Sequence, residues 1–276
     1  MELLLPVVAI GGMGLIFGAL LAVAAKIFAV EKDERIPLIE ECLPGANCGG
    51  CGYAGCGAAA AAIVSGEASV NCCPVGGSDA AEKIAAIMGV KAEKSERMVA
   101  FVMCSGNADT AKTKYDVNEK IDCHTAHRLS GGMKECSFGC LGFGSCVSKC
   151  KFGGISIQNG VAVVDSENCT NCGACMTECP RHIIRSVPYN AKVLVSCNSK
   201  SKGKETRNAC EVGCIGCGIC AKNCEAGAIE VKDNLAVVDF SKCTGCGVCV
   251  EKCPRKIIQP VGNAPEIQVA IKAAKM

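Results

Sequence analysis

The 276-residue sequence has no tryptophan, three tyrosines, seven phenylalanines and three histidines. It also lacks an excess of either charge, because 29 Lys and Arg balance 27 Asp and Glu, which argues against a nucleic-acid-binding surface. No G-x-G-x-x-G segment follows a predicted strand, and P-loops and Cys-x-x-Cys-His runs are absent. Dinucleotide-binding folds, nucleotide triphosphatases and c-type cytochromes are therefore excluded. No Ser, His and Asp spacing indicates a hydrolase.

Cysteine, by contrast, is abundant, with 26 residues. Small secreted disulfide scaffolds reach such a fraction, but they are usually too short to build a core, whereas this chain is long enough for several domains. The cysteines also recur two to four residues apart. We therefore predict thiolate ligands for metal centres rather than disulfides.

The N-terminal region is apolar and uncharged over residues 3–25. At about 1.5 Å per residue this run covers the roughly 30 Å hydrocarbon core of a bilayer, so we predict a transmembrane helix. A signal peptide is the alternative, since Ala22-Val23-Ala24 resembles a cleavage site, but no positive charge other than the amino terminus precedes the run. Lys26, Lys32 and Arg35 follow it, which predicts a single-pass protein of the cell membrane with its bulk on the cytoplasmic side.

A repeat with an offset of 74 residues relates 155–184 to 229–258. Each copy predicts a short hairpin that turns at Gln158-Asn159-Gly160 or Lys232-Asp233-Asn234. The bacterial ferredoxin signature C-x2-C-x2-C-x3-C-P follows each hairpin. Zinc sites use two separated cysteine pairs, so four-iron clusters fit this spacing better. The eight ligands are Cys169, Cys172, Cys175, Cys179, Cys243, Cys246, Cys249 and Cys253.

Two-cluster ferredoxins exchange the fourth cysteine of each run between their clusters. In the second repeat, an upstream run supplies the partner cysteines. One predicted set is Cys214, Cys217, Cys220 and Cys253, and the other is Cys224, Cys243, Cys246 and Cys249.

The corresponding run of the first repeat, CSFGCLGFGSCVSKC over 136–150, has the wrong spacing. Phe143 stands where the offset places Cys217, and we expect Cys136 to supply the missing thiolate; a lost cluster is the alternative. The predicted sets are Cys136, Cys140, Cys146 with Cys179, and Cys150, Cys169, Cys172 with Cys175.

A further four-cysteine module precedes the repeats. The spacing C-x2-C-x4-C-x16-C followed by Pro selects Cys48, Cys51, Cys56 and Cys73. Helices are predicted over 57–64, ending near Gly66, and from a cap at Ser78 or Asp79 to Met88. Cys42 and Cys72 are assigned no role.

Four cysteines remain, namely Cys104, Cys123, Cys197 and Cys210. Two of them follow similar apolar strands, MVAFVMC and KVLVSC. We expect these four thiols to hold a sixth cluster, with buried free thiols or zinc as alternatives. Cys210 occupies the position equivalent to Cys136, and the sixth cluster fails if Cys210 serves its own repeat.

The expected fold is α+β: a transmembrane helix, a four-cysteine iron–sulfur module and two tandem ferredoxin-like domains, with six 4Fe-4S clusters. The expected segments are the transmembrane helix 1–25, a juxtamembrane linker 26–37, the module 38–90, a connecting segment 91–134, the first ferredoxin-like domain 135–187, a connecting segment 188–212, the second domain 213–262 and a tail 263–276.

These motifs, from the apolar N-terminus through the module to both ferredoxin runs, resemble the B subunits of Rnf electron transport complexes in their long form. The resemblance implies a subunit that accepts electrons from soluble reduced ferredoxin and relays them toward partner subunits that carry flavin and bind NAD, coupled to Na⁺ or H⁺ translocation. It implies membership of an oxidoreductase complex without a catalytic substrate site on this chain alone. An iron–sulfur relay of another membrane oxidoreductase, such as a hydrogenase or a quinone-linked dehydrogenase, is the alternative function.

The docking surface for ferredoxin is predicted at a basic run. Its members are Lys200, Lys202, Lys204 and Arg207. Small ferredoxins tend to be acidic, so this run suits electrostatic steering. A solvated loop without such a role is the alternative.

Overall fold

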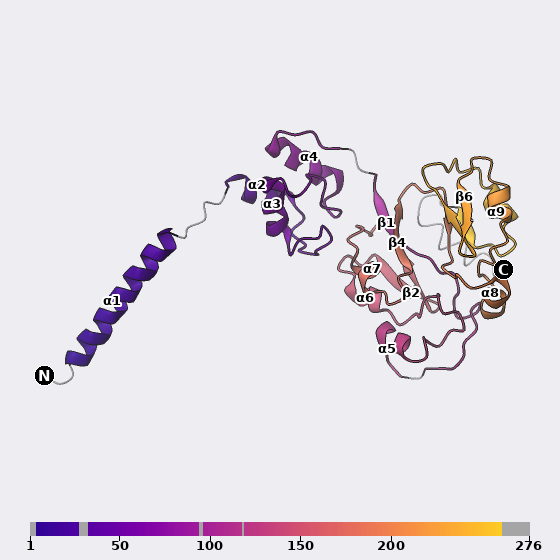
Figure 1. Ribbon diagram of the computed structural model, residues 1–276, viewed down its shortest axis with the longest axis horizontal. Helices are drawn as coiled ribbons and strands as arrows, with labels where there is room; N and C mark the ends of the chain where they lie inside the picture. Colours follow the sequence, from indigo (N-terminus) through magenta and orange to yellow (C-terminus); the bar gives the residue numbers. More distant parts are fainter. Residues whose placement is uncertain (1–3, 28–32, 94–95, 118, 261–276) are drawn as a thin grey trace.

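The computed structural model describes residues 4–27, 33–93, 96–117 and 119–260 (Figure 1). The tail predicted at 263–276 and part of the linker predicted at 26–37 lie outside the described residues. The helices are α1 Leu4–Ile27, α2 Arg35–Cys42, α3 Cys56–Ser65, α4 Gly77–Met88, α5 Cys123–Arg128, α6 Ser145–Lys149, α7 Ala174–Glu178, α8 Gly203–Ala209, α9 Ile219–Lys222 and α10 Val248–Lys252. The strands are β1 Met98–Val102, β2 Ile155–Gln158, β3 Val161–Val164, β4 Ile184–Pro188, β5 Val193–Val195, β6 Ile229–Lys232, β7 Leu235–Val238 and β8 Ile258–Pro260.

Helix α1 occupies the apolar N-terminal run. Several of its large apolar side chains are exposed, including Leu15 and Leu21. Judged on the residues that the structure describes, no helix combines the length and the apolarity of a membrane span. The transmembrane helix therefore stays a prediction.

Helices α2, α3 and α4 form the N-terminal module around a small apolar core. Ile39, Ile63 and Ile84 are almost fully buried there. The many alanines of α3 favour the helix and let it approach its neighbours closely. The helix ends at Gly66, which adopts a left-handed φ of 80°, as predicted.

Helix α4 starts differently from the prediction. It begins at Gly77 and has no side-chain cap, so neither Ser78 nor Asp79 caps it. The amide of the N-cap residue Gly76 instead donates to Cys73 Sγ at 3.3 Å, which ties the helix start to the cysteine turn before it. The end of the helix at Gly89, with φ of 67°, confirms the predicted stop.

The 74-residue repeat appears in the structure as two units of the same design. Hairpin β2–β3 of the first unit corresponds to hairpin β6–β7 of the second. Both turns have positive φ at their two central residues, 46° and 74° at Asn159-Gly160 and 47° and 62° at Asp233-Asn234. Two-residue turns of this kind match the twist of antiparallel strands. The predicted hairpins are confirmed.

Each unit also has a second antiparallel pair, which sequence patterns did not predict. Strand β1 pairs with β4, with Val102 opposite Ile184, and β5 pairs with β8, with Val195 opposite Ile258. Strands β1 and β5 come from the segments expected to be connections, 91–134 and 188–212. Each therefore contributes a strand to a ferredoxin-like unit and carries a cysteine shortly after it.

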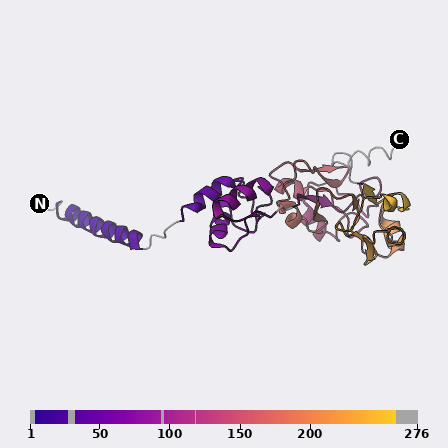
Figure 2. The same ribbon diagram turned by 90° about the horizontal axis from the view of Figure 1, so that it is seen from above.

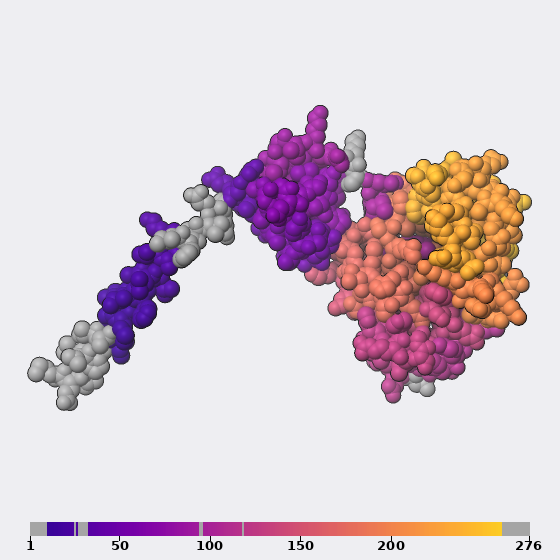
Figure 3. Space-filling view, in the orientation of Figure 1, coloured from indigo at the N-terminus to yellow at the C-terminus, as the bar shows by residue number. Residues whose placement is uncertain are grey.

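The N-terminal module lies beside the first unit, and the second unit lies on the far side of the first (Figures 1 and 2). Figure 3 shows the module against the first unit in the space-filling view. Gly50 packs against the backbone of Cys172, because a Cβ on that glycine would stand 2.6 Å from the Cys172 oxygen. The two units are joined by backbone hydrogen bonds, such as Ser105 N to Ser196 O at 3.0 Å and Lys112 N to Ala209 O at 3.0 Å.

Candidate iron–sulfur centres

Two of the predicted cysteine sets line cavities in the ferredoxin-like units. The first outer set consists of Cys150, Cys169, Cys172 and Cys175. The second inner set consists of Cys214, Cys217, Cys220 and Cys253. In each set three thiols come from one loop and helix, and the fourth comes from the other half of the unit. This is the exchange typical of two-cluster ferredoxins.

Members of two more predicted sets lie close together. In the second outer set, Cys249 lies close enough to Cys243 and Cys246 that their charges raise its pKa, after the larger effect of burial. Cys224, the fourth member, belongs to the same apolar core. In the module set, Cys73 lies close to Cys48 and Cys51 in the same way. Cys56, the predicted fourth member, packs against the same apolar core as Cys51 and Cys73, and its amide donates to Asn47 Oδ1 at 2.8 Å.

Around the irregular run of the first unit, the structure groups the cysteines differently from the sequence-based prediction. Cys123, rather than Cys136, shares a cavity with the other three thiols, and the resulting first inner set is Cys123, Cys140, Cys146 and Cys179. Helix α5 begins at Cys123, and the Cys123 amide donates to the buried Ser145 Oγ at 2.9 Å. Ser145 begins the helix that carries Cys146, so this hydrogen bond holds the two thiols near each other.

Phe143 explains how this exchange is accommodated. It stands at the position of Cys217 in the second unit, and it packs against the cluster of Cys123, Ala126 and Leu141. The aromatic side chain therefore helps to hold helix α5 in place. Cys123, at the start of that helix, then occupies the position of the missing ligand.

The displaced Cys136 lies instead with three of the four leftover cysteines. One cavity is lined by Cys104, Cys136, Cys197 and Cys210, which we call the central set. Two glycines show how closely the backbone approaches these thiols. A Cβ added to Gly139 would lie 3.6 Å from both Cys104 Sγ and Cys136 Sγ, and a Cβ added to Gly106 would lie 3.1 Å from Cys210 Sγ. The sequence-based prediction placed Cys123, rather than Cys136, in this set.

The central set is symmetric between the two units. Cys140 N donates to Cys104 Sγ at 3.3 Å, and its repeat equivalent Cys214 N donates to Cys197 Sγ at 3.3 Å. Each unit thus contributes one thiol from beyond a strand, after β1 or β5, and one thiol from the start of its cysteine run. The central set lies at the junction of the units.

Two arginines that sequence reasoning missed reinforce this symmetry. Arg181 donates from Nη1 to the carbonyl of Cys136 at 2.9 Å, and its equivalent Arg255 donates from Nη2 to the carbonyl of Cys210 at 2.6 Å. Each arginine directly follows the proline of a ferredoxin signature. The Cys-Pro-Arg sequence was the available signal. Both guanidinium groups fix the turns that carry central thiols.

Burial makes these thiols poor acids in the absence of a metal. It raises the pKa of Cys197 and of Cys146 to about 12, and the pKa of Cys220 to about 11. Thiols of this kind stay protonated at neutral pH unless a metal displaces the proton. Binding of an iron–sulfur cluster would supply that displacement.

The chemistry of the donor sets fits 4Fe-4S clusters. Each set offers four thiols and few other side chains that could bind metal, and thiolates are the ligands of such clusters. Within the described part of the chain, no three His, Cys, Asp or Glu side chains are arranged around a single metal ion. At the central set, the buried Lys134 lines the same cavity, and no carboxylate of the described residues forms an ion pair with it, which suits an anionic group.

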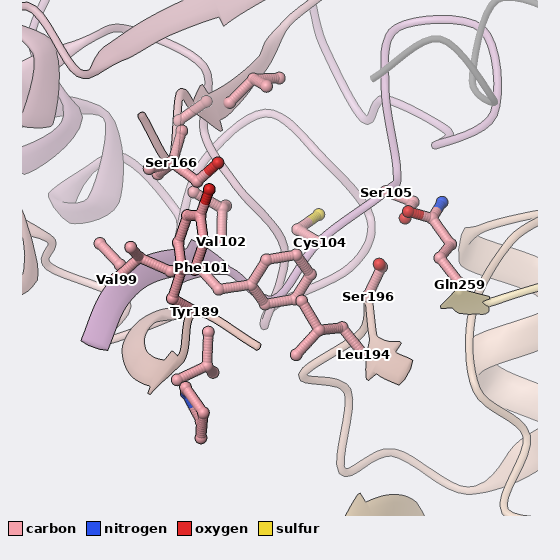
Figure 4. Close-up of a pocket in the computed structure, with 16 residues that line it drawn as sticks. Val99, Phe101, Val102, Cys104, Ser105, Ser166, Tyr189, Leu194, Ser196 and Gln259 are labelled. Atoms are coloured by element: carbon pink, nitrogen blue, oxygen red, sulfur yellow. The ribbon is translucent and has the colours of Figure 1, made fainter. Parts of the chain in front are cut away.

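A cavity of about 80 Å³ lies where β1, β3 and β4 meet β5. Figure 4 shows Phe101 and Leu194 in this seam, with the Cys104 thiol beside the Phe101 ring. Valines and other apolar side chains dominate the lining, and it contains no Asp, Glu, Lys, Arg or His. The seam therefore shields one side of the central set with apolar surface.

Comparison with protein families agrees with these sites. Residues 43–75 match the family described as a putative Fe-S cluster. Residues 162–185 match the 4Fe-4S binding domain, and residues 213–257 match the 4Fe-4S dicluster domain. Iron–sulfur families thus match the module, the second unit and the part of the first unit that carries its regular cysteine run.

Relatives of similar length extend the match to most of the chain. The B subunit of the Na(+)-translocating ferredoxin:NAD(+) oxidoreductase complex of Acetobacterium woodii is 46% identical over 87% of this chain and 72% of the relative. The B subunit of the ion-translocating oxidoreductase complex of Methanosarcina acetivorans is 43% identical over 91% and 95%. The B subunit of the proton-translocating ferredoxin:NAD(+) oxidoreductase complex of Clostridium ljungdahlii is 43% identical over 83% and 81%. At these identities and coverages, the chain belongs to the family of B subunits of ion-translocating oxidoreductase (Rnf) complexes.

Proposed function

We propose that this chain is the membrane-anchored iron–sulfur electron-transfer subunit of an Rnf complex, taking electrons from reduced ferredoxin and passing them toward partner subunits that carry flavin and bind NAD. The relatives' names give ferredoxin and NAD(+) as reactants and Na⁺ or protons as the translocated ions. Bound 4Fe-4S clusters supply one-electron redox chemistry. The observation that carries the proposal is the continuous order of six cysteine sets through the molecule.

The order follows from contacts between neighbouring sets. Gly50 of the module packs against Cys172 of the first outer set. Helix α6 links that set to the first inner set, because Cys146 lies in the helix and Cys150 directly follows it. The amide of Cys140 then reaches Cys104 of the central set at 3.3 Å.

The second half of the order mirrors the first. The amide of Cys214 in the second inner set reaches Cys197 of the central set at 3.3 Å. Helix α9 carries Cys220, and Cys224 of the second outer set follows shortly after it. We propose that electrons enter at the second unit and leave through the N-terminal module, which is closer in sequence to the proposed membrane anchor.

The second unit offers features suited to accepting electrons. Cys217 and Cys246 are its exposed cysteines. The basic run lies against this part of the unit, since a Cβ on Gly203 would stand 2.6 Å from Ile215 O. Lys200 pairs with Asp233 at 3.6 Å, whereas among the described residues Lys202, Lys204 and Arg207 have no ion pair. These three charges are available to an acidic partner.

Charge reversal tests the docking of ferredoxin. We expect the triple variant Lys202→Glu, Lys204→Glu, Arg207→Glu to be reduced by ferredoxin at least about tenfold more slowly at low salt, because steering by opposite charge is lost. Reduction by dithionite should be unchanged. Stopped-flow absorbance at several salt concentrations measures both rates. Reversal of two exposed module lysines, Lys83 and Lys91, is the matched control. An unchanged ferredoxin rate with unchanged salt dependence contradicts docking at this run.

Membrane anchoring through α1 is tested at its exposed apolar side chains. We expect Leu15→Arg with Ile16→Arg to move the full-length protein from the membrane to the soluble fraction, since each arginine costs about 2.5–3.5 kcal/mol at the centre of a membrane helix. Leu38→Arg is the control, because Leu38 is also exposed but lies on α2. Fractionation followed by iron analysis measures the outcome. A doubly substituted protein that still requires detergent for release contradicts the anchor.

A further inference from the structure

Lys134 is the most deeply buried charged side chain among the described residues, with 2% of its surface exposed. Its Nζ donates to the carbonyl of Gly106 at 2.7 Å and to that of Gly160 at 3.1 Å. Gly106 follows Cys104, and Gly160 lies in the β2–β3 turn. The ammonium is thus held by backbone at the edge of the cavity that the central set lines.

The two carbonyls satisfy hydrogen bonds but do not neutralise the charge. In the described part of the chain, no carboxylate lies within ion-pair distance of Lys134. A buried charge is costly unless it is paired. The opposite charge available in this cavity comes from the four cysteines once they are thiolates bound to a cluster.

Lys134 also breaks the symmetry of the central site. The offset of 74 residues relates Cys136 to Cys210 and one arginine to the other, and Cys104 and Cys197 each follow a corresponding strand, β1 or β5. The same offset places Asn208, which is exposed, at the position of Lys134. The additional positive charge therefore comes from the first unit only. Arg181, itself buried, adds a second cation on the same side through the Cys136 carbonyl.

We propose that Lys134 is the built-in counter-charge of the central site, and that it raises the reduction potential of a cluster bound there. An added electron would make such a cluster more negative, and a fixed, buried cation beside it would stabilise that added charge. Surrounding charge and burial are known determinants of cluster potential. The inference rests on the proposed electron-transfer function and on the central ligand set.

The test is a mediated redox titration of the full-length protein followed by electron paramagnetic resonance. Lys134→Met removes the charge and keeps a long apolar side chain. We expect the equilibrium constant for reduction of the central cluster to fall about tenfold, which is a 59 mV lower potential for a one-electron couple. The charge of Lys134 also acts on Cys140 of the first inner set, so the potential of that cluster should fall by less, and the other potentials should be unchanged. The signal with the larger shift must be the one that Cys136→Ala abolishes. An unshifted potential with full iron content overturns the proposal.

Matched variants separate charge from structure. Lys114→Met is the control, because Lys114 also donates to a carbonyl, that of Ser130 at 2.8 Å, but is exposed. If Lys134→Met loses iron, the variants Lys134→Arg and Lys134→Gln distinguish a role of the charge from a structural role. Iron content and potential restored by Arg but not by Gln would support the counter-charge. Full restoration of both by Gln would overturn it. Mediators replace ferredoxin in the titration, so failure of ferredoxin docking would leave this result readable.

Discussion

A chain that carries both Cys104→Ala and Cys136→Ala is expected to lose about four iron atoms, the same loss as each single variant, because both thiols serve one 4Fe-4S cluster. The structure places these residues in one cavity with Cys197 and Cys210. A second substitution in the same ligand set removes nothing further. Iron and sulfide analysis of the purified full-length protein measures the loss.

The pair Cys104→Ala with Cys123→Ala gives the opposite expectation. These thiols line different cavities, so about eight iron atoms should be lost. The sequence-based grouping reverses both results, because it joins Cys104 to Cys123 and separates Cys104 from Cys136. Cys42→Ala is the control and should retain all iron, since Cys42 lies at the end of α2 and belongs to none of the six sets.

The variant Gly50→Val is expected to interrupt the relay without removing iron. Its Cβ would stand 2.6 Å from Cys172 O and 3.0 Å from Cys172 Cα, and backbone atoms cannot rotate aside. Overpacking of this kind costs about 1–3 kcal/mol. The ratio of docked to undocked module should therefore fall about 5- to 150-fold. Reduction of the module cluster by electrons from the second unit should slow accordingly.

Rapid freeze-quench spectroscopy after mixing with reduced ferredoxin follows the module signal in time. Ala54→Val is the matched control, because it enlarges an exposed side chain of the same loop. A hydrogen bond between the module and the first unit, Lys151 Nζ to Ala46 O at 3.4 Å, is too exposed to hold the interface alone. An unchanged rate in Gly50→Val would show that the Cys172 contact does not lie on the route.

The sequence predicted the local features of this protein well. Hairpins β2–β3 and β6–β7 follow from alternation and from turns that tolerate positive φ, as at Asn159-Gly160. The ends of α3 and α4 follow from Gly66 and Gly89. The regular cysteine runs need only a loop and one helical turn to gather three thiols. All of these depend on neighbours in the sequence.

What depended on tertiary placement could not be predicted. The pairing of β1 with β4 brings Cys104 to the junction of the units, and helix α5 takes Cys123 away from it. No spacing rule distinguishes Cys123 from Cys136 as the replacement for Phe143. The burial of Lys134 was likewise invisible, since a lone lysine between glycines and a cysteine run is usually exposed.

The central set has a thermodynamic consequence, because its thiols lie on both units and are far apart in the chain. A group bound to Cys104 and Cys210 closes a loop of about 100 residues, and a cross-link of that span removes about 4.7 kcal/mol of chain entropy from the unfolded state. A cluster bound there would thus cross-link the two ferredoxin-like units. Iron at this one position would couple the unfolding of the two ferredoxin-like units into a single transition.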